Sequence, residues 1–230
     1  MSVEFVSAAR ATRAVAHDAP LRLVDTFGRV ARDLRVSLTD RCNLRCSYCM
    51  PPEGLDWLPV EETLSDAEVV RLVRIGVEQL GIRQVRFTGG EPLLRRGLET
   101  IIAECSQLVT DEGRTPDLAL TTNALGLAKR AQGLKDAGLD RVNISLDSLD
   151  PEHYAAITRR DRLSDVLEGI EAAARAGLSP IKVNALVLRG MNEADLPDLV
   201  DYCLDRGIEL RVIEQMPISP PDTWDRQNIM

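Results

Sequence analysis

The stretch that decides the fold is residues 39–51, TDRCNLRCSYCMP, which holds three cysteines with the spacing C-x3-C-x2-C. A loop this short can direct the thiolates of Cys42, Cys46 and Cys49 at one centre. Thiolates are the ligands of iron–sulfur clusters and of thiophilic metals. A four-iron cluster on three cysteines keeps one iron without a protein ligand, and that iron can bind a small chelating molecule. The spacing therefore favours an iron–sulfur site.

Two other interpretations of the three cysteines stay open on spacing alone. A structural zinc ion normally takes four ligands, commonly as two separated pairs, and the two histidines, His17 and His153, are far away in the sequence. A disulfide beside one free thiol is the other interpretation, but disulfides are rare in the cytosol, where the composition places this chain. The ligand count favours the cluster.

Tyr48 places an aromatic residue directly before the third cysteine, and with it the motif resembles that of the radical S-adenosylmethionine (SAM) superfamily. The longer string at residues 34–51, LRVSLTDRCNLRCSYCMP, is similar to the GTP 3′,8-cyclase family, which opens molybdenum cofactor biosynthesis. The resemblance extends from about residue 25 to about residue 217. It implies a lyase that converts GTP to (8S)-3′,8-cyclo-7,8-dihydroguanosine 5′-triphosphate, with a 4Fe–4S cluster on the three cysteines and SAM as cofactors.

The resemblance also implies roles for single residues. It implies SAM contacts at Tyr48, Gly90, Ser145 and Met216, and GTP contacts at Arg35, Arg86, Thr121 and Lys182. By residue type alone these positions also suit a Gly-Gly turn, helix and turn caps, or an exposed strand edge. The sequence departs from the family pattern at Ala124, where Gly is usual, and at Gln215, where Phe is usual. The basic string 158–160, TRR, is left without a role.

The implied chemistry is a radical reaction. The cluster cleaves SAM, the 5′-deoxyadenosyl radical takes a hydrogen from C3′ of GTP, and the carbon radical adds to C8 of guanine. GTP and SAM are the implied partners, with a reductant protein such as flavodoxin or ferredoxin and room for a homodimer. Family members continue well beyond the position matching Met230 and hold a second 4Fe–4S cluster there. Cys105 and Cys203 do not match that motif, so the second cluster is not expected in this chain, which is expected to be truncated and impaired in turnover.

Strand and helix patterns alternate along the chain. Strands are predicted at 34–38, 84–88, 117–122, 141–146, 181–188 and 209–213, and helices at 66–80, 98–109, 128–137, 163–176 and 194–206. Ser65 and Glu68 form a capping box at the start of the first helix, whose predicted buried face includes Leu72. Alternating strands and helices predict an α/β fold of parallel βα units. Periodicity does not separate a doubly wound sheet from a barrel; the resemblance implies a partial (β/α)6 TIM-type barrel with the site at the C-terminal ends of its strands.

Composition limits the size of the fold and the kinds of partner that we expect. The 230 residues, 44% of them hydrophobic, allow one domain with a sizeable core. The net charge of −8 and the pI of about 4.9 argue against a nucleic-acid partner. The sequence has no apolar run long enough for a membrane span, and we expect a cytoplasmic protein. We predict a mobile extension at 1–24, the barrel at 25–217, and the start of a missing C-terminal region at 218–230. Cys105 and Cys203 are predicted to lie in the core.

Anaerobic reconstitution with iron and sulfide tests the cluster prediction. The reduced protein is expected to show the electron paramagnetic resonance signal of a 4Fe–4S cluster, and the signal is expected to shift when SAM binds the open iron. Two hypotheses compete: another radical SAM enzyme, which shares this result, and a non-catalytic thiolate metal-binding or redox protein. A folded, colourless protein that contains zinc, or no metal, would contradict the cluster and favour the second.

Overall fold

A computed structural model describes residues 21–215 and shows one six-stranded parallel sheet with helices. The strands, paired in chain order, are β1 (Asp33–Ser37), β2 (Gln84–Thr88), β3 (Asp117–Thr122), β4 (Arg141–Ser145), β5 (Ile181–Leu186) and β6 (Glu209–Ile213). The α-helices are α1 (Asp66–Arg74), α2 (Leu98–Cys105), α3 (Leu127–Asp136), α4 (Pro151–Thr158), α5 (Leu163–Arg175) and α6 (Leu196–Asp205). Short helical turns lie at η1 (Val60–Glu62), η2 (Ile75–Gln79), η3 (Pro92–Leu94) and η4 (Glu193–Asp195).

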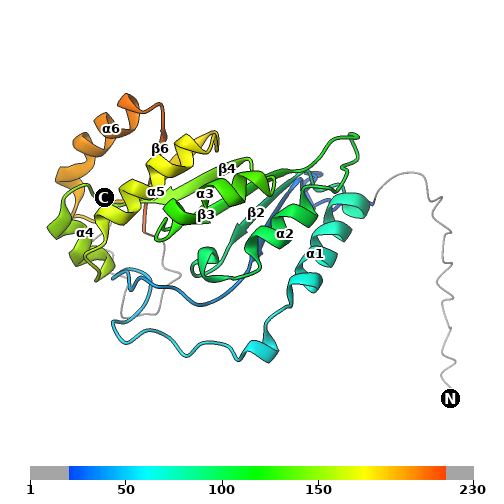
Figure 1. Cartoon of the computed structure of the whole chain (residues 1–230), viewed down its shortest axis with the longest axis horizontal. Helices are drawn as coiled ribbons and strands as arrows, with labels where there is room; N and C mark the ends of the chain where they lie inside the picture. Colours follow the sequence, from blue (N-terminus) through cyan, green and yellow to red (C-terminus); the bar gives the residue numbers. More distant parts are fainter. Residues whose placement is uncertain (1–20, 216–230) are drawn as a thin grey trace, which may run out of the picture.

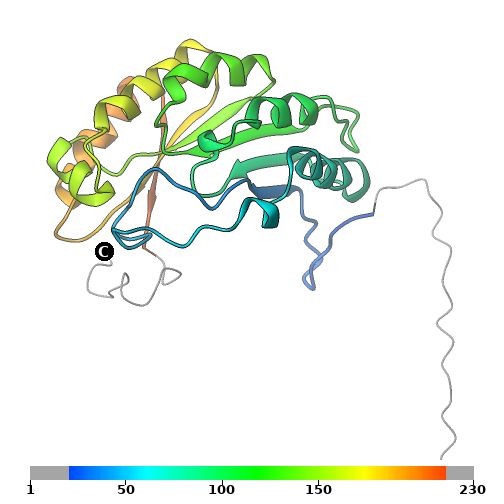
Figure 2. The ribbon, with the colours of Figure 1, turned by 60° about the horizontal axis from the view of Figure 1, so that its bottom comes forward.

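The strand order distinguishes a barrel from a doubly wound sheet. A doubly wound sheet reverses its order at a switch point, whereas the order here runs from β1 to β6 without reversal. The sheet is curved, and its helices lie on one face, as the two views show (Figures 1 and 2). Among the described strands, β1 and β6 are not paired with each other. The sheet is therefore an open, partial barrel, as predicted.

The two faces of the sheet differ in chemistry because successive strand side chains point to opposite faces. In β2, Val85 and Phe87 are fully buried in the hydrophobic core beneath the helices. Gln84, Arg86 and Thr88 alternate with them and face the concave side. The same alternation in the other strands places further cations on the concave face, namely Arg35, Arg141, Lys182 and Arg211.

The structure corrects two sequence predictions about helices. Helix α4 was not predicted, although Asp150 accepts hydrogen bonds at its N-terminus from the N–H groups of Glu152 and His153 and Pro151 occupies its first turn, which is a strong start signal. Leu72 was predicted to be buried and is 52% exposed. The stripe spaced by four residues from Val69 faces the core, and Leu72 lies about 100° away from it.

Other predictions hold where the structure describes them. The capping box of Ser65 and Glu68 is present, and Cys105 and Cys203 are buried in the core. None of the helices in the described part of the chain has the length and apolar character that crossing a bilayer requires. Most of the predicted extension at 1–24, and all of 218–230, lie outside the described residues, so these domain boundaries remain predictions.

Replacement of Phe87 tests whether the side chains packed between the sheet and the helices contribute strongly to the free energy of unfolding. Phe87→Ala is expected to lower the free energy of unfolding by about 3–5 kcal/mol, because it leaves a cavity in a fully buried strand. Chemical denaturation measures this change. Phe27→Ala is the matched control, since Phe27 is 82% exposed, and its cost is expected to stay under about 1 kcal/mol. Equal losses for the two variants would contradict the assignment of the core.

Candidate active site

The three predicted cluster cysteines line one cavity of about 210 Å³ at the C-terminal ends of the strands. Cys42 and Cys46 are half-buried, Cys49 is exposed, and all three are free thiols. The predicted SAM contacts in the described chain line the same cavity, as does one predicted GTP contact; these residues are Tyr48, Gly90, Ser145 and Thr121. Met216 lies outside the described residues, and its predicted role stays a prediction.

Gly89 and Gly90 hold the entrance of the cysteine loop against the sheet. The N–H of Gly90 donates to Thr39 O at 2.7 Å, and the N–H of Glu91 donates to Arg41 O at 2.7 Å. A Cβ on Gly89 would lie 2.3 Å from Thr39 O, and one on Gly90 would lie 2.3 Å from Arg41 O. Both positions therefore exclude a side chain because the loop backbone comes so close. The structural reason for the glycine pair is this contact, and Gly90 lines the cavity in addition.

Glu91 fixes the floor of the cavity. Its buried carboxylate accepts hydrogen bonds from Leu93 N at 2.9 Å, Thr122 Oγ1 at 2.7 Å and Asn123 N at 2.7 Å. Asn123 in turn donates through Nδ2 to Asn43 Oδ1 at 2.8 Å, and the same Nδ2 lies 3.9 Å from Cys42 Sγ. One buried acid thus connects the ends of β2 and β3 to the first cysteine.

Asp147 fixes a second part of the cavity lining. Tyr48 Oη donates to Asp147 Oδ2 at 2.8 Å, and the N–H of Leu186 donates to Asp147 Oδ1 at 2.8 Å. Asn192 donates to the carbonyl oxygen of Asp147 at 2.7 Å. The aromatic residue of the motif is therefore held from a position 99 residues away.

The donor set of the cavity fits an iron–sulfur cluster. Burial raises the pKa of all three thiols, and that of Cys46 rises to about 12. The thiols are protonated without a metal, and metal binding displaces those protons. Within residues 21–215, no three His, Cys, Asp or Glu side chains are arranged to hold a single ion. A 4Fe–4S cluster binds each thiolate through a different iron, so spaced thiols around one cavity suit it.

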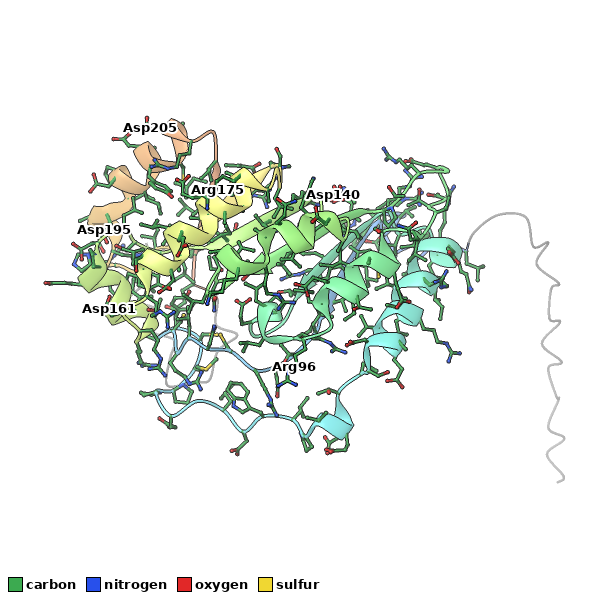
Figure 3. The ribbon with its side chains drawn as sticks, viewed as in Figure 1. Arg96, Asp140, Asp161, Arg175, Asp195 and Asp205 are labelled. Atoms are coloured by element: carbon green, nitrogen blue, oxygen red, sulfur yellow. The ribbon has the colours of Figure 1, made fainter. Side chains whose placement is uncertain are left out.

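A second cavity, of about 900 Å³, lies at the N-terminal ends of the strands and is lined by cations. Arg86 and Lys182 line it together with Arg141 and Arg211, and Arg35 lies beside Arg86 in register. Asp140, which lines this cavity, and Asp161, just beyond α4, are labelled toward opposite ends of the sheet in Figure 3. The cationic cavity is lined by the first residues of β3 and β4, and the cysteine cavity by their last residues, so the two cavities lie at the two ends of the strands.

Arg86 is the unbalanced charge of the cationic cavity. Its side chain makes no ion pair or hydrogen bond to any residue in 21–215, and its Nε is buried without a partner. Burial lowers the pKa of Arg86, and the positive charges of Arg141, Arg35 and Arg211 lower it further. The cavity thus presents a desolvated cation among other cations, which is an environment suited to an anion.

Acidic neighbours balance three of the other cations, whereas Arg35, like Arg86, has no ion pair within residues 21–215. Arg141 Nε contacts Asp117 at 2.9 Å. Lys182 Nζ and Arg211 Nη2 both contact Glu209, at 2.7 and 2.8 Å. The sequence analysis did not select Arg141 or Arg211, although the two-residue alternation of their strands would have placed both on the face of Arg86.

The row of residues between the cavities is polar. Asn143 donates to Thr121 Oγ1 at 3.3 Å and pairs in register with Lys182. Its Oδ1 is buried without a hydrogen-bond partner in the described chain. Asn143 Oδ1 and Arg86 Nε are thus two buried polar atoms on this face without partners in the described chain, and a polar ligand there would complete their hydrogen bonding.

One expectation about the site needs correction. The resemblance implied a site at the C-terminal ends of the strands, but Arg86 occupies the middle of β2, and Arg35 and Lys182 likewise lie within their strands, as the predicted strand ranges have them. The cations therefore lie away from the cysteine end because strand alternation, not the loops, presents them. Ala124 adopts φ +64°, so the replacement of the family's usual glycine falls at a position that favours glycine.

Comparison with known proteins defines the class. The profile of the Radical SAM superfamily matches residues 36–203, which span the strands and helices from β1 into α6. A crystal structure of Streptococcus suis SuiB bound to S-adenosylmethionine superposes with a TM-score of 0.66 at 19% identity, covering 83% of this chain and 40% of that one. The chain therefore belongs to the radical SAM superfamily. The family's cofactors, a 4Fe–4S cluster and SAM, are those that the cysteine motif implied.

Curated relatives show which proteins of the superfamily this chain resembles in sequence. A GTP 3′,8-cyclase from Corynebacterium glutamicum is 64% identical over 208 residues, which are 90% of this chain and 55% of the relative. A GTP 3′,8-cyclase from Mycobacterium sp. (strain KMS) is 60% identical over 204 residues, or 89% of this chain and 57% of the relative. The chain spans a little over half the length of these relatives.

Glu91→Gln tests the floor of the cavity. All three groups that contact the carboxylate are donors, so an amide N–H₂ in place of one oxygen leaves a buried donor facing a donor. The free energy of unfolding is expected to fall by about 1–3 kcal/mol. Urea denaturation measures it, with Glu61→Gln at an exposed position as the control. An unchanged stability in Glu91→Gln would show that the carboxylate does not hold this segment.

Proposed function

We propose that this chain is the radical SAM core of a GTP 3′,8-cyclase, with the cofactor at the cysteine end of the sheet and the triphosphate of GTP at the cationic end. The observation that carries the proposal is the half-buried Arg86, whose Nε is buried without a partner in the described chain, among cations on the face that also leads to the cysteine cavity. The identity of 60–64% to cyclases over about nine-tenths of the chain supports the choice of substrate.

At the cofactor end, the proposal assigns the cluster to Cys42, Cys46 and Cys49, and it assigns SAM to Tyr48, Gly90, Ser145 and Met216. When bound, the cluster and SAM supply a one-electron cleavage that gives a 5′-deoxyadenosyl radical. The protein's contribution there is placement. Glu91 and Asp147 hold residues that line the cavity, so the motif residues present a fixed surface to the cofactor.

At the substrate end, Arg35, Arg86 and Lys182 bind the phosphates, with Arg141 and Arg211 beside them. Guanidinium groups suit phosphate because they donate paired hydrogen bonds as well as charge. Thr121 and Asn143 lie between the two ends. They offer hydrogen bonds to the sugar, whose C3′ must reach the radical. The sheet thus sets the distance between the phosphate-binding cations and the reacting carbon.

This chain matches only part of each relative, whereas the proposal concerns the whole cyclase reaction. Formation of the cyclic product, a reductant protein, a homodimer and a cytoplasmic location remain predictions. The chain spans a little over half of the cyclases that it resembles. The phosphate end can be tested on the chain as it stands, because every cation that we assign lies within the described residues.

Isothermal titration tests the phosphate end. GTP is expected to bind more tightly than GMP, because the cations contact the β- and γ-phosphates. Arg86→Gln is expected to weaken GTP binding by about 10- to 100-fold, the loss of one or two charge-assisted hydrogen bonds. Arg96→Gln is the control, since Arg96 is exposed and lies outside this cavity. Equal affinities for GTP and GMP, or no effect of Arg86→Gln, would count against the proposal.

A further inference from the structure

The C-terminal end of α4 packs against the cysteine loop through backbone hydrogen bonds. The N–H of Arg45 donates to Thr158 O at 3.1 Å, and the N–H of Ser47 donates to Ile157 O at 2.8 Å. The last carbonyl groups of a helix lack partners within the helix. The cysteine loop therefore caps α4, and α4 in turn fixes the backbone on both sides of Cys46.

Arg159, the residue that ends α4, has an unusual backbone conformation. Its φ is +56° and its ψ is 30°, in the left-handed region. Helices often end in this conformation, but the residue is usually glycine, because a Cβ is disfavoured there. Among the described residues, only Ala124 shares a positive φ without being glycine. A long cationic side chain at such a position raises the question of what that side chain contacts.

The guanidinium of Arg159 reaches back to the cysteine loop. Its Nη1 donates to Arg45 O at 3.0 Å and to Met50 O at 2.8 Å. These two carbonyl groups lie immediately outside Cys46 and Cys49 in the sequence. One nitrogen therefore closes the ends of the segment that carries the second and third cysteines, and the turn within it is closed by the N–H of Cys49 donating to Cys46 O at 2.9 Å.

We propose that Arg159 is a positioning residue that holds Cys46 and Cys49 in the geometry that accepts the cluster. The inference rests on the proposed cluster at these cysteines and adds a residue that touches neither the iron nor SAM. Groups that orient metal ligands influence metal retention strongly. Here Arg159 acts on the backbone that bears the thiols, which keeps the two thiols at the cavity before any iron arrives.

The neighbouring Arg160 offers a matched comparison. It is exposed, and within residues 21–215 its guanidinium donates to the carbonyl oxygen of its own neighbour, Arg159 O, at 2.9 Å. The two arginines share chemistry and location but differ in contact with the loop. Removal of either one removes the same charge from this end of the molecule, so a difference between them reports the hydrogen bonds of Arg159 to the loop.

Arg159→Gly is the test variant, with Arg160→Gly as the control. Glycine accepts the positive φ without strain, so the melting temperature is expected to stay the same or rise while the guanidinium contacts are lost. Two quantities are measured: amide hydrogen exchange of residues 45–50 in the metal-free chain, and iron release to a ferrous chelator from the reconstituted chain. Both are expected to be faster in Arg159→Gly, iron release by about tenfold, and unchanged in Arg160→Gly.

The two measurements separate this inference from the proposed function. Loop exchange and iron release in Arg159→Gly within twofold of the unmodified chain would overturn the positioning role. Faster exchange in a chain that takes up no iron would contradict the cluster, and with it the proposed function, while supporting the contact of Arg159 with the loop. If Arg159→Gly does not fold, Arg159→Lys takes its place, and exchange that is not faster in that shorter side chain would equally overturn the role.

Discussion

The constraint on which this structure depends is that its parallel sheet is covered by helices on one face only. Parallel sheets are normally covered on both faces, and the uncovered face here carries charged and polar side chains at most of its alternating strand positions. Arg86 and Asn143 on that face have buried polar atoms without partners in the described chain. Such atoms are costly unless a ligand or water satisfies them, so the fold is built around something that binds in its concavity.

The cysteine end depends on close backbone contacts more than on side-chain charge. Gly89 and Gly90 admit the loop backbone at distances that exclude a Cβ, and Glu91 and Asp147 anchor the loop's polar residues to strands far away in the sequence. The segment from β1 to α1 runs along the side of the sheet opposite the helices, as Figure 2 shows. The cavity is thus preorganised from several strands at once, which is how a site gains precision that a free loop lacks.

Sequence reasoning failed where the local pattern was short or where partners were distant. Helix α4 spans only eight residues, too few for periodicity to reveal it, although its capping signal was present. Strand alternation places Arg141 and Arg211 on the face of Arg86, but only the folded, curved sheet brings their charges near enough to influence Arg86. Arg159 was seen as part of a basic string. Its contact with Arg45 and Met50 joins residues more than 100 positions apart, which no local pattern contains.

The sequence by itself determined the class of site and the architecture. Three closely spaced cysteines restrict the bound group, and strands alternating with helices restrict the sheet to parallel pairing, because both signals are local in the chain. Only the tertiary structure decided that the cysteines and the cations occupy opposite ends of one concave face, that Arg86 Nε is buried without a hydrogen-bond partner in the described chain, and that Ala124 and Arg159 adopt left-handed backbones. The physical reason is that register, burial and backbone strain arise when distant segments meet, and they exist only once the sheet has formed.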